Sequence, residues 1–424
     1  MLQGFPLVRF INLGLRSSTL LAKFALIFLL AYFLDPADVA LYGLMAVTIA
    51  YSIFGLGFDF YTFSTREIVG SEPDQWMRYL RDQGIFFGLT YTGVLPLLSL
   101  IFMLGLLPWW VAPWFFALVL LEHLAQELNR LLIAMSRQLL ASFVLFLRSG
   151  LWALAIVALF WLWPEYRSLR FVFAAWTLGA LAACLCGSLA FLSLDRMSLK
   201  MPVDWQWIRQ GVKIAVPLLV ATLAIRGVFT FDRYWVQSLA STEVLAAYVL
   251  YAGVANAVMS FLDAGVFVFL YPRLISAFKG LDGVKFRSGM RGLLQQTALV
   301  TLLLVISAAI LIHPLLIWLD KNAYIENVNI LYVLLLAIGF YALSMVPHYG
   351  LYAMSQDRHI IYSHVSTFLV FVALAATLTQ WNSVYGVPLA LCGAFSLMLI
   401  HKTLAYIVLK SRLPWMNAEA TFAR

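Results

Sequence analysis

Five basic residues lie inside apolar runs that are long enough to cross a membrane. They are Arg16, Lys23, Arg148, Arg226 and Arg233. A cation at the centre of a membrane helix costs about 2.5–3.5 kcal/mol, so five such side chains facing lipid would be hard to sustain. Arginine offers a planar fork of donors that matches phosphate oxygens, and lysine offers a point charge. These residue types therefore predict a functional polar cavity lined by cations.

The spacing of these cations places them on two polar helix stripes. Asn12, Arg16, Thr19 and Lys23 follow the i, i+4, i+7, i+11 pattern and share one face of a helix. A second stripe carries Thr222, Arg226, Thr230, Arg233 and Gln237. The two cations of each stripe are seven residues apart. We expect the substrate to be bound by Arg16, Lys23, Arg148, Arg226, Thr230 and Arg233.

The alternative is that the cations pair with carboxylates in the same segments. The candidates are Asp59, Glu122, Glu127, Asp232 and Asp263. Glu127 and Arg130 have the i, i+3 spacing of a local ion pair, whereas Glu122 has no obvious local partner. Directional transport across a membrane needs a coupled ion, and a desolvated carboxylate is the usual group that binds it. Glu122 and Asp263 are therefore the expected sites for H+ or Na+.

No pattern in the chain predicts an enzyme. We find no Ser–His–Asp order, no glycine-rich phosphate loop and no metal-ligand spacing, so no catalytic residue, metal or cofactor is expected. His313, His348, His364 and His401 do not cluster in the sequence. Each is interpreted as a structural or interfacial histidine. The three cysteines lie in apolar runs and are expected to be buried apolar residues.

The composition is that of a polytopic membrane protein. Hydrophobic residues make up 63% of the 424 positions and charged residues 11%, against roughly 25% charged residues in soluble domains. A sliding window of about 19 residues predicts twelve spans. They lie near 10–34, 39–59, 83–105, 113–135, 138–163, 171–194, 212–238, 245–270, 291–318, 328–354, 359–380 and 384–409.

The basic residues between the spans predict the orientation. Three lie in the loops opposite the termini: Arg167, Arg170 and Lys321. Twenty lie on the side of the termini: Arg9, Arg66, Arg78, Arg81, Arg130, Arg137, Arg196, Lys200, Arg209, Lys213, Arg273, Lys279, Lys285, Arg287, Arg291, Arg358, Lys402, Lys410, Arg412 and Arg424. Both termini are therefore expected in the cytoplasm. This bias also explains the net charge of +8 without any nucleic-acid partner.

The chain is expected to divide into two halves of six helices. The boundaries are 1–196 for the first bundle, 197–211 for a cytoplasmic interfacial linker, 212–410 for the second bundle and 411–424 for a tail. Trp205, Trp207 and Arg209 suit a short helix lying at the membrane surface. A weak internal repeat relates Arg66 to Arg273.

Six stretches resemble the Wzx-type polysaccharide flippases of the multidrug/oligosaccharidyl-lipid/polysaccharide exporter superfamily, which is related to the MATE and MurJ families. These are "AKFALIFLLAYFLDPADVALYGLM" (22–45), "FGLGFDFYTFSTREI" (54–68), "NRLLIAMSRQLLASFVLFLRSGLW" (129–152), "DWQWIRQGVKIAVPLLV" (204–220), "TFDRYWVQSLASTEVLAAY" (230–248) and "LYPRLISAF" (270–278). They cover roughly the first two-thirds of the chain.

The resemblance implies an all-α membrane protein with twelve transmembrane helices in two pseudo-symmetric six-helix bundles, in the bacterial inner membrane. Its cargo would be an undecaprenyl-pyrophosphate-linked oligosaccharide of O-antigen or exopolysaccharide, moved from the cytoplasmic to the periplasmic leaflet by alternating access. Bilayer lipids and polysaccharide polymerase machinery are the further expected partners. Two alternatives remain: a cation-coupled multidrug exporter of the same superfamily, and a membrane glycosyltransferase or polymerase that uses the same carrier lipid.

Overall fold

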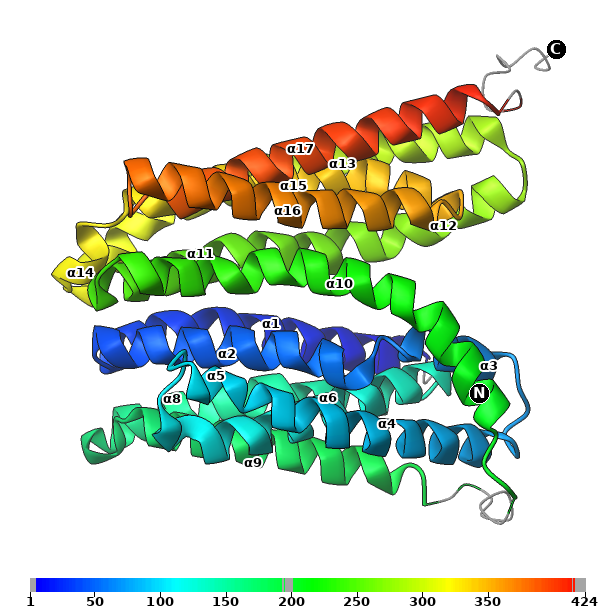
Figure 1. The fold of residues 1–424 in the computed structure, drawn as a ribbon, viewed down its shortest axis with the longest axis horizontal. Coiled ribbons are helices and arrows are strands. Elements are labelled where there is room, and N and C mark those ends of the chain that lie inside the picture. Colours follow the sequence, from blue (N-terminus) through cyan, green and yellow to red (C-terminus); the bar gives the residue numbers. More distant parts are fainter. Residues whose placement is uncertain (1–4, 193, 195–200, 414, 416–424) are drawn as a thin grey trace. The chain divides into compact units, whose positions relative to one another are not determined.

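Helices are the only regular secondary structure in the residues that the computed structural model describes, which are 5–192, 194, 201–413 and 415 (Figure 1). Twelve of these helices are long and apolar enough to cross a membrane, which confirms the predicted number of spans. The protein is therefore a multi-pass membrane protein with an all-α fold.

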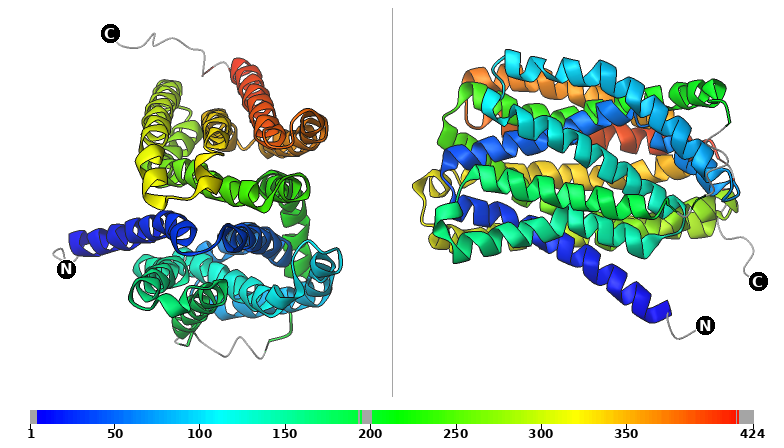
Figure 2. Two further views of the ribbon diagram at one scale, coloured as in Figure 1. Left: turned by 90° about the vertical axis from the view of Figure 1, so that its left-hand side faces the viewer. Right: turned by 90° about the horizontal axis from the view of Figure 1, so that it is seen from below.

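The chain divides into two compact units, Met1–Leu223 and Ala224–Arg424, and the boundary between them falls inside one long helix. The first unit contains α1 (Phe5–Phe33), α2 (Pro36–Gly57), α3 (Tyr61–Val69), α4 (Trp76–Leu98), α5 (Leu100–Met103), η1 (Trp109–Val111), α6 (Ala112–Ala134), α7 (Gln138–Phe146), η2 (Leu147–Leu151), α8 (Trp152–Leu162), η3 (Pro164–Tyr166) and α9 (Leu169–Leu189). Its long helices run side by side, and the first turns of α1 extend away from them (Figure 2).

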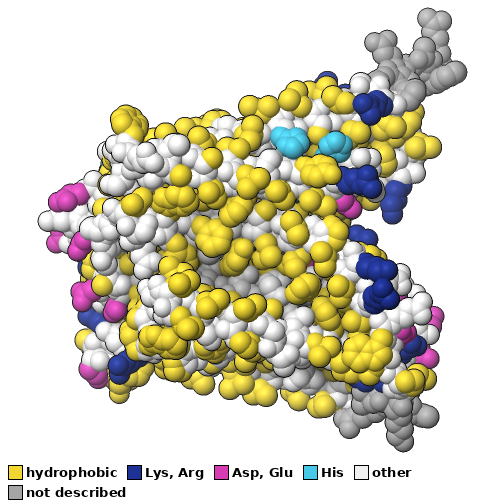
Figure 3. Space-filling view, in the orientation of Figure 1, with side chains coloured by type: hydrophobic (Ala, Val, Ile, Leu, Met, Phe, Trp, Pro, Cys, Tyr) yellow, Lys and Arg dark blue, Asp and Glu magenta, His cyan; other side chains and the backbone are white. Residues whose placement is uncertain are grey.

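The long helix that carries the division is α10 (Trp205–Leu239). After it, the second unit contains α11 (Thr242–Leu262), η5 (Asp263–Phe267), α12 (Val268–Lys279), α13 (Gly283–Leu319), α14 (Asn322–Ile325), α15 (Asn329–Ala353), α16 (Asp357–Trp381) and α17 (Gly386–Ser411). On the visible face of each unit, hydrophobic side chains cover the middle, and Lys and Arg side chains lie mainly at one end (Figure 3). That distribution is typical of helices that cross a bilayer.

A repeated helix ending relates the two units. α6 ends in Ala-Met-Ser at 134–136, and α15 ends in the same three residues at 353–355. Ser136 and Ser355 both have a left-handed backbone, with φ of 60° and 57°. After each serine, the next amide donates to the carbonyl five residues back, at 2.8 and 2.9 Å. This 6→1 bond is the Schellman ending of a helix, and it supports an internal repeat.

The short helix predicted around Trp205, Trp207 and Arg209 is not a separate element. Trp205 and Trp207 form the first turn of α10 itself, which continues without a break as the seventh span. Residues 195–200 of the expected linker lie outside the described part of the chain. Trp207 is buried against Phe60 and Phe63, and a side chain at Gly211 would collide with the same two rings. Aromatic packing in the first unit therefore fixes the start of α10.

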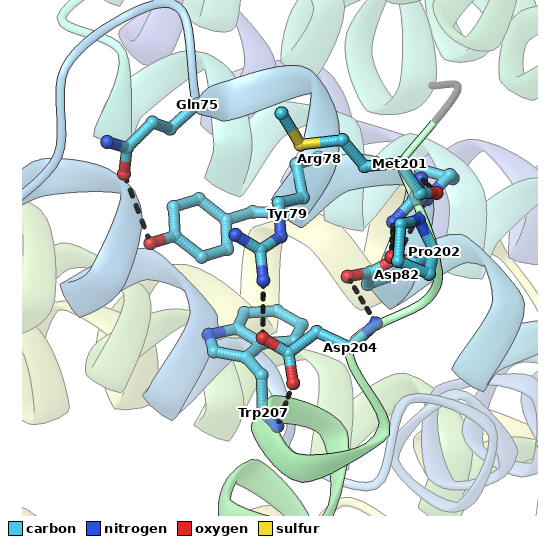
Figure 4. Close-up of polar contacts among 9 residues, drawn as sticks. Gln75, Arg78, Tyr79, Asp82, Met201, Pro202, Asp204 and Trp207 are labelled. Atoms are coloured by element: carbon cyan, nitrogen blue, oxygen red, sulfur yellow. Dashed lines mark hydrogen bonds and ion pairs between the residues drawn. The ribbon is translucent and has the colours of Figure 1, made fainter. Parts of the chain in front are cut away.

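Polar contacts also hold the start of α10 on α4 (Figure 4). Asp204 pairs with Arg78 of α4, and its other carboxylate oxygen accepts the backbone N–H of Trp207 at 2.9 Å. The carboxylate of Asp82 is buried, pairs with Arg81 at 2.6 Å and accepts the amide of Asp204 at 3.2 Å. Asp204 thus caps α10 and ties it to its neighbour at once.

Candidate functional site

The polar stripe of α1 carries two exposed cations. Arg16 and Lys23 are both exposed, although they lie inside the first candidate span. α1 packs against α7, and the Nε of Arg16 donates to the hydroxyl of Ser142 at 3.0 Å. The same hydroxyl donates to the side chain of Asn12. Thr19, by contrast, is buried and donates to the carbonyl of its own helix four residues back.

Arg148 lies in η2, a π-helical turn that interrupts the fifth span. Its Nε donates to the buried carboxylate of Glu122 at 2.6 Å, and its Nη2 donates to Gln126 at 3.1 Å. Trp176 donates its indole N–H to the other oxygen of Glu122 at 2.7 Å. Glu122, for which the sequence offered no local partner, therefore has two partners, from a different helix each. Such π-turns are frequent at functional sites.

These residues form a group with more positive than negative formal charge. Lys23 lies within electrostatic range of both Arg148 and Glu122. We call Arg16, Lys23, Arg148 and Glu122 the first-unit cation group. It contains three basic side chains and one carboxylate, and that carboxylate already accepts from Arg148 and Trp176. Two formal positive charges in it remain for a ligand or for water.

The second unit holds a balanced and buried ion pair. Arg233 and Asp232 are 5% and 2% exposed, and their Nη1 and Oδ1 atoms are 3.1 Å apart. The guanidinium also donates to the carbonyl of Phe229 at 2.5 Å, and Tyr248 donates its hydroxyl to Asp232 at 2.8 Å. For Arg233, the side chains therefore form the ion pair with a carboxylate that the sequence leaves open as the alternative to substrate binding.

Arg226 lies in a different environment from Arg233 on the same helix. Its side chain is exposed, and it lies within electrostatic range of Asp263, which is exposed as well. Asp263 opens η5, a π-helical turn in the eighth span. Thr230 is buried and its hydroxyl donates to the carbonyl of Arg226 at 2.9 Å, so it faces its own backbone.

The structure thus sorts the predicted site residues into three sets. Lys23, Arg148 and Glu122 come together in the first unit, and Arg16 lies seven residues before Lys23 on the same helix, where it contacts Ser142. Arg226 and Asp263 are both exposed and lie within electrostatic range of each other in the second unit. Arg233 and Thr230 are buried, one in an ion pair and the other in a backbone hydrogen bond. Their roles toward a substrate or an ion stay predictions.

The second carboxylate of α6 belongs to a buried network. Glu127 pairs with Arg130 as the i, i+3 spacing predicts, and it accepts from Gln83 of α4 at 3.1 Å. The Arg130 guanidinium lies 3.5 Å above the ring centre of Tyr61. A cavity of about 310 Å³ borders Glu127 and Gln83. Among the described residues no group of three or more His, Cys, Asp or Glu could hold a metal ion.

Sequence reasoning missed the position of Lys402. The sequence predicts this lysine among the basic residues on the side of the termini, but it lies nine residues before the end of α17 and is fully buried. Its ammonium nitrogen is 3.3 Å from the Nε2 of His364. The rings of His364 and His348 stack with centroids 5.9 Å apart. A fixed window of hydropathy could not detect this cluster, since its members come from three different helices.

Comparisons with known proteins bear on the fold. No sequence family and no curated protein matches the chain by sequence. The inward-facing structure of a multidrug resistance MATE family transporter of the MOP superfamily is similar, with a TM-score of 0.76, 13% identity, and coverage of 96% of this chain and 99% of that one.

Two further solved structures have the same fold. A MATE in the straight conformation has a TM-score of 0.63 and 13% identity, covering 95% of each chain. The Vibrio cholerae MATE transporter VcmN, solved as a point mutant, has a TM-score of 0.58 and 12% identity, covering 97% of each chain. The chain therefore has the fold of the MATE transporters of the MOP superfamily.

Proposed function

We propose that this protein is a transporter that moves a lipid-linked oligosaccharide with an anionic pyrophosphate head from the cytoplasmic to the periplasmic leaflet of a bacterial inner membrane. The observation that carries this proposal is the exposure of Arg16, Lys23 and Arg226 inside candidate spans. The fold of the neighbours, which are transporters by their titles, supports transport and argues against an enzyme.

The exposure matters because of its depth. Arg226 lies 13 residues before the end of α10, which is roughly 20 Å of helix. A cation exposed to hydrocarbon at such a depth is costly, so its surroundings must be polar: protein groups such as Asp263, water or a polar ligand. A pyrophosphate supplies oxygens for an arginine fork, and the attached sugars need a wet route. The lipid tail stays in the bilayer.

A multidrug exporter is the second candidate, and the titles of the similar structures favour it. An exporter of cationic drugs needs acidic or apolar walls, because like charges repel. The first-unit cation group has the opposite sign: three basic side chains and one carboxylate, which is already paired. On charge, an anionic cargo fits these residues better.

Binding of the carrier lipid to purified protein tests the proposal. We expect native mass spectrometry to detect undecaprenyl pyrophosphate on the wild type and at least tenfold weaker binding to the double variant Arg16→Gln/Lys23→Gln. Each lost charge-assisted contact is worth about 1.5–3 kcal/mol, and 1.4 kcal/mol is tenfold in affinity. Arg167→Gln, an exposed cation in the loop before α9, is the matched control and should bind like the wild type.

The same measurement separates the two candidates. Binding of a cationic drug such as ethidium, with no binding of the pyrophosphate lipid, would contradict the proposal and favour the multidrug exporter. Equal loss of lipid binding in the Arg167→Gln control would mean that net charge alone draws the lipid to the protein, and the first-unit cation group would then have no special role.

A further inference from the structure

The second unit buries a lysine among histidines and gives it no acid. Lys402 of α17 is 0% exposed, and its Nζ lies 3.3 Å from the Nε2 of His364 on α16. His348 of α15 stacks on His364, with ring centroids 5.9 Å apart and planes within 4°. The Nδ1 of His348 is buried without a hydrogen-bond partner among the described residues. We call these three residues the basic triad.

The three helices that form the basic triad carry no carboxylate near it. α15 and α17 contain no Asp or Glu, and α16 contains Asp357, which is exposed in its first turn. That turn is seven residues, or roughly 10 Å, from His364. From α13, Met290 lies beside Gly350 of α15. From η5, Asp263 lies within electrostatic range of Tyr349, the residue after His348. His401 lies within electrostatic range of Lys402 and His359, and all three are basic.

A buried ammonium without a counter-ion is costly, and a second positive charge about 3 Å away costs far more. The three nitrogen bases of the basic triad can therefore share one proton but cannot each hold one. With one proton, the ammonium donates to the imidazole Nε2, which satisfies both groups. Groups that interact this strongly titrate together, as a unit.

We propose that Lys402, His364 and His348 form a proton-binding site in the second unit that holds a single proton and releases or takes it up as the protein changes state. The ligand is H+, and no other bond forms or breaks. The sequence pointed to the carboxylates Glu122 and Asp263 for ion coupling, whereas this site is built of bases. Its use to drive transport rests on the proposed function, but proton binding itself does not.

Thermal unfolding of the purified protein as a function of pH tests the proposal and needs no cargo. At pH 8.5 both the unfolded chain and the folded site hold one proton on these three bases, whereas at pH 5.5 the unfolded chain protonates all three and the folded site still holds one. The wild type should therefore lose stability as the pH falls from 8.5 to 5.5. In Lys402→Met the two histidines are free to take that proton. For each unit by which the pH falls, the unfolding midpoint of Lys402→Met should therefore fall by about 2 °C less than that of the wild type.

Two further variants keep the test decisive. His364→Gln should flatten the pH dependence as Lys402→Met does, and it serves alone if the lysine variant does not fold. His313→Gln is the control: this histidine is exposed on α13 and contacts Tyr332, so the wild-type slope should remain. Parallel curves for the wild type, Lys402→Met and His364→Gln would overturn the proposal. Stabilisation of the wild type, but not of Lys402→Met, by inorganic pyrophosphate at constant pH would also overturn it, because the basic triad would then be an anion site.

Discussion

Exposure, rather than residue type, separates the charged side chains of the spans. Arg226 and Arg233 belong to one helix and are seven residues apart, yet one is exposed and the other is 5% exposed beside Asp232. Helical periodicity predicts that both lie on one stripe, because it depends only on the angle between residues of one helix and carries no information about packing. Arg233 has its partners on its own helix, Asp232 and the carbonyl of Phe229, and Tyr248 of the next helix donates to Asp232 in turn.

Alanine at these two positions should therefore affect different properties: lipid binding for Arg226 and folding stability for Arg233. Arg226→Ala should keep the unfolding midpoint of the wild type and weaken binding of undecaprenyl pyrophosphate by tenfold or more. Arg233→Ala leaves the carboxylate of Asp232 buried without its cation, which costs about 3–5 kcal/mol of folding free energy. Thermal unfolding and native mass spectrometry of both variants provide the check. Loss of stability in Arg226→Ala with normal lipid binding would make that arginine a structural residue.

The elements themselves could be predicted well where hydropathy decides them. All twelve spans appear, because a run of about 20 apolar residues is helical in a bilayer whatever it packs against. The interruptions could not be predicted. η2 and η5 are π-turns inside the fifth and eighth spans, and each carries one of the predicted site residues, Arg148 or Asp263. A single extra backbone residue in a turn leaves no signal in a hydropathy window.

The seventh span is predicted to begin near residue 212, but α10 begins at Trp205, because packing and capping by the first unit extend it. This helix start can be tested by mutation. Asp204→Ala removes both the cap on Trp207 and the ion pair with Arg78. A lost cap costs about 1 kcal/mol. Amide exchange in the first turn of α10 should accelerate about fivefold, since local opening follows local stability.

Two variants control this experiment. Asp204→Asn keeps a capping oxygen and loses the charge, so exchange intermediate between the wild type and Asp204→Ala would measure the ion pair alone. Asp35 occupies the N-cap of α2 but makes no side-chain cap hydrogen bond, so Asp35→Ala should leave exchange in α2 unchanged. Unchanged exchange in Asp204→Ala would show that aromatic packing of Trp207 suffices to hold the helix start.

For the whole molecule, the sequence predicted the fold class and the orientation by different arguments. The fold follows from twelve spans, and the similar solved structures have it as well. The basic triad could not be predicted, because Lys402, His364 and His348 meet only when α15, α16 and α17 pack together. Moving Lys402 from the side of the termini into a bundle removes one of twenty basic residues from that side, so the bias over the three opposite residues persists.

That bias makes a prediction about sidedness, which cysteine labelling can check. In a chain with its three native cysteines replaced by serine, Ser168→Cys before α9 should react with a membrane-impermeant maleimide applied from the periplasm. Val284→Cys, exposed at the start of α13, should react only after the inner membrane is opened. Lys285, Arg287 and Arg291 follow Val284, and basic segments of this kind are retained in the cytoplasm. Labelling of Val284→Cys in intact cells, with Ser168→Cys protected, would invert the orientation and with it the direction of transport that we propose.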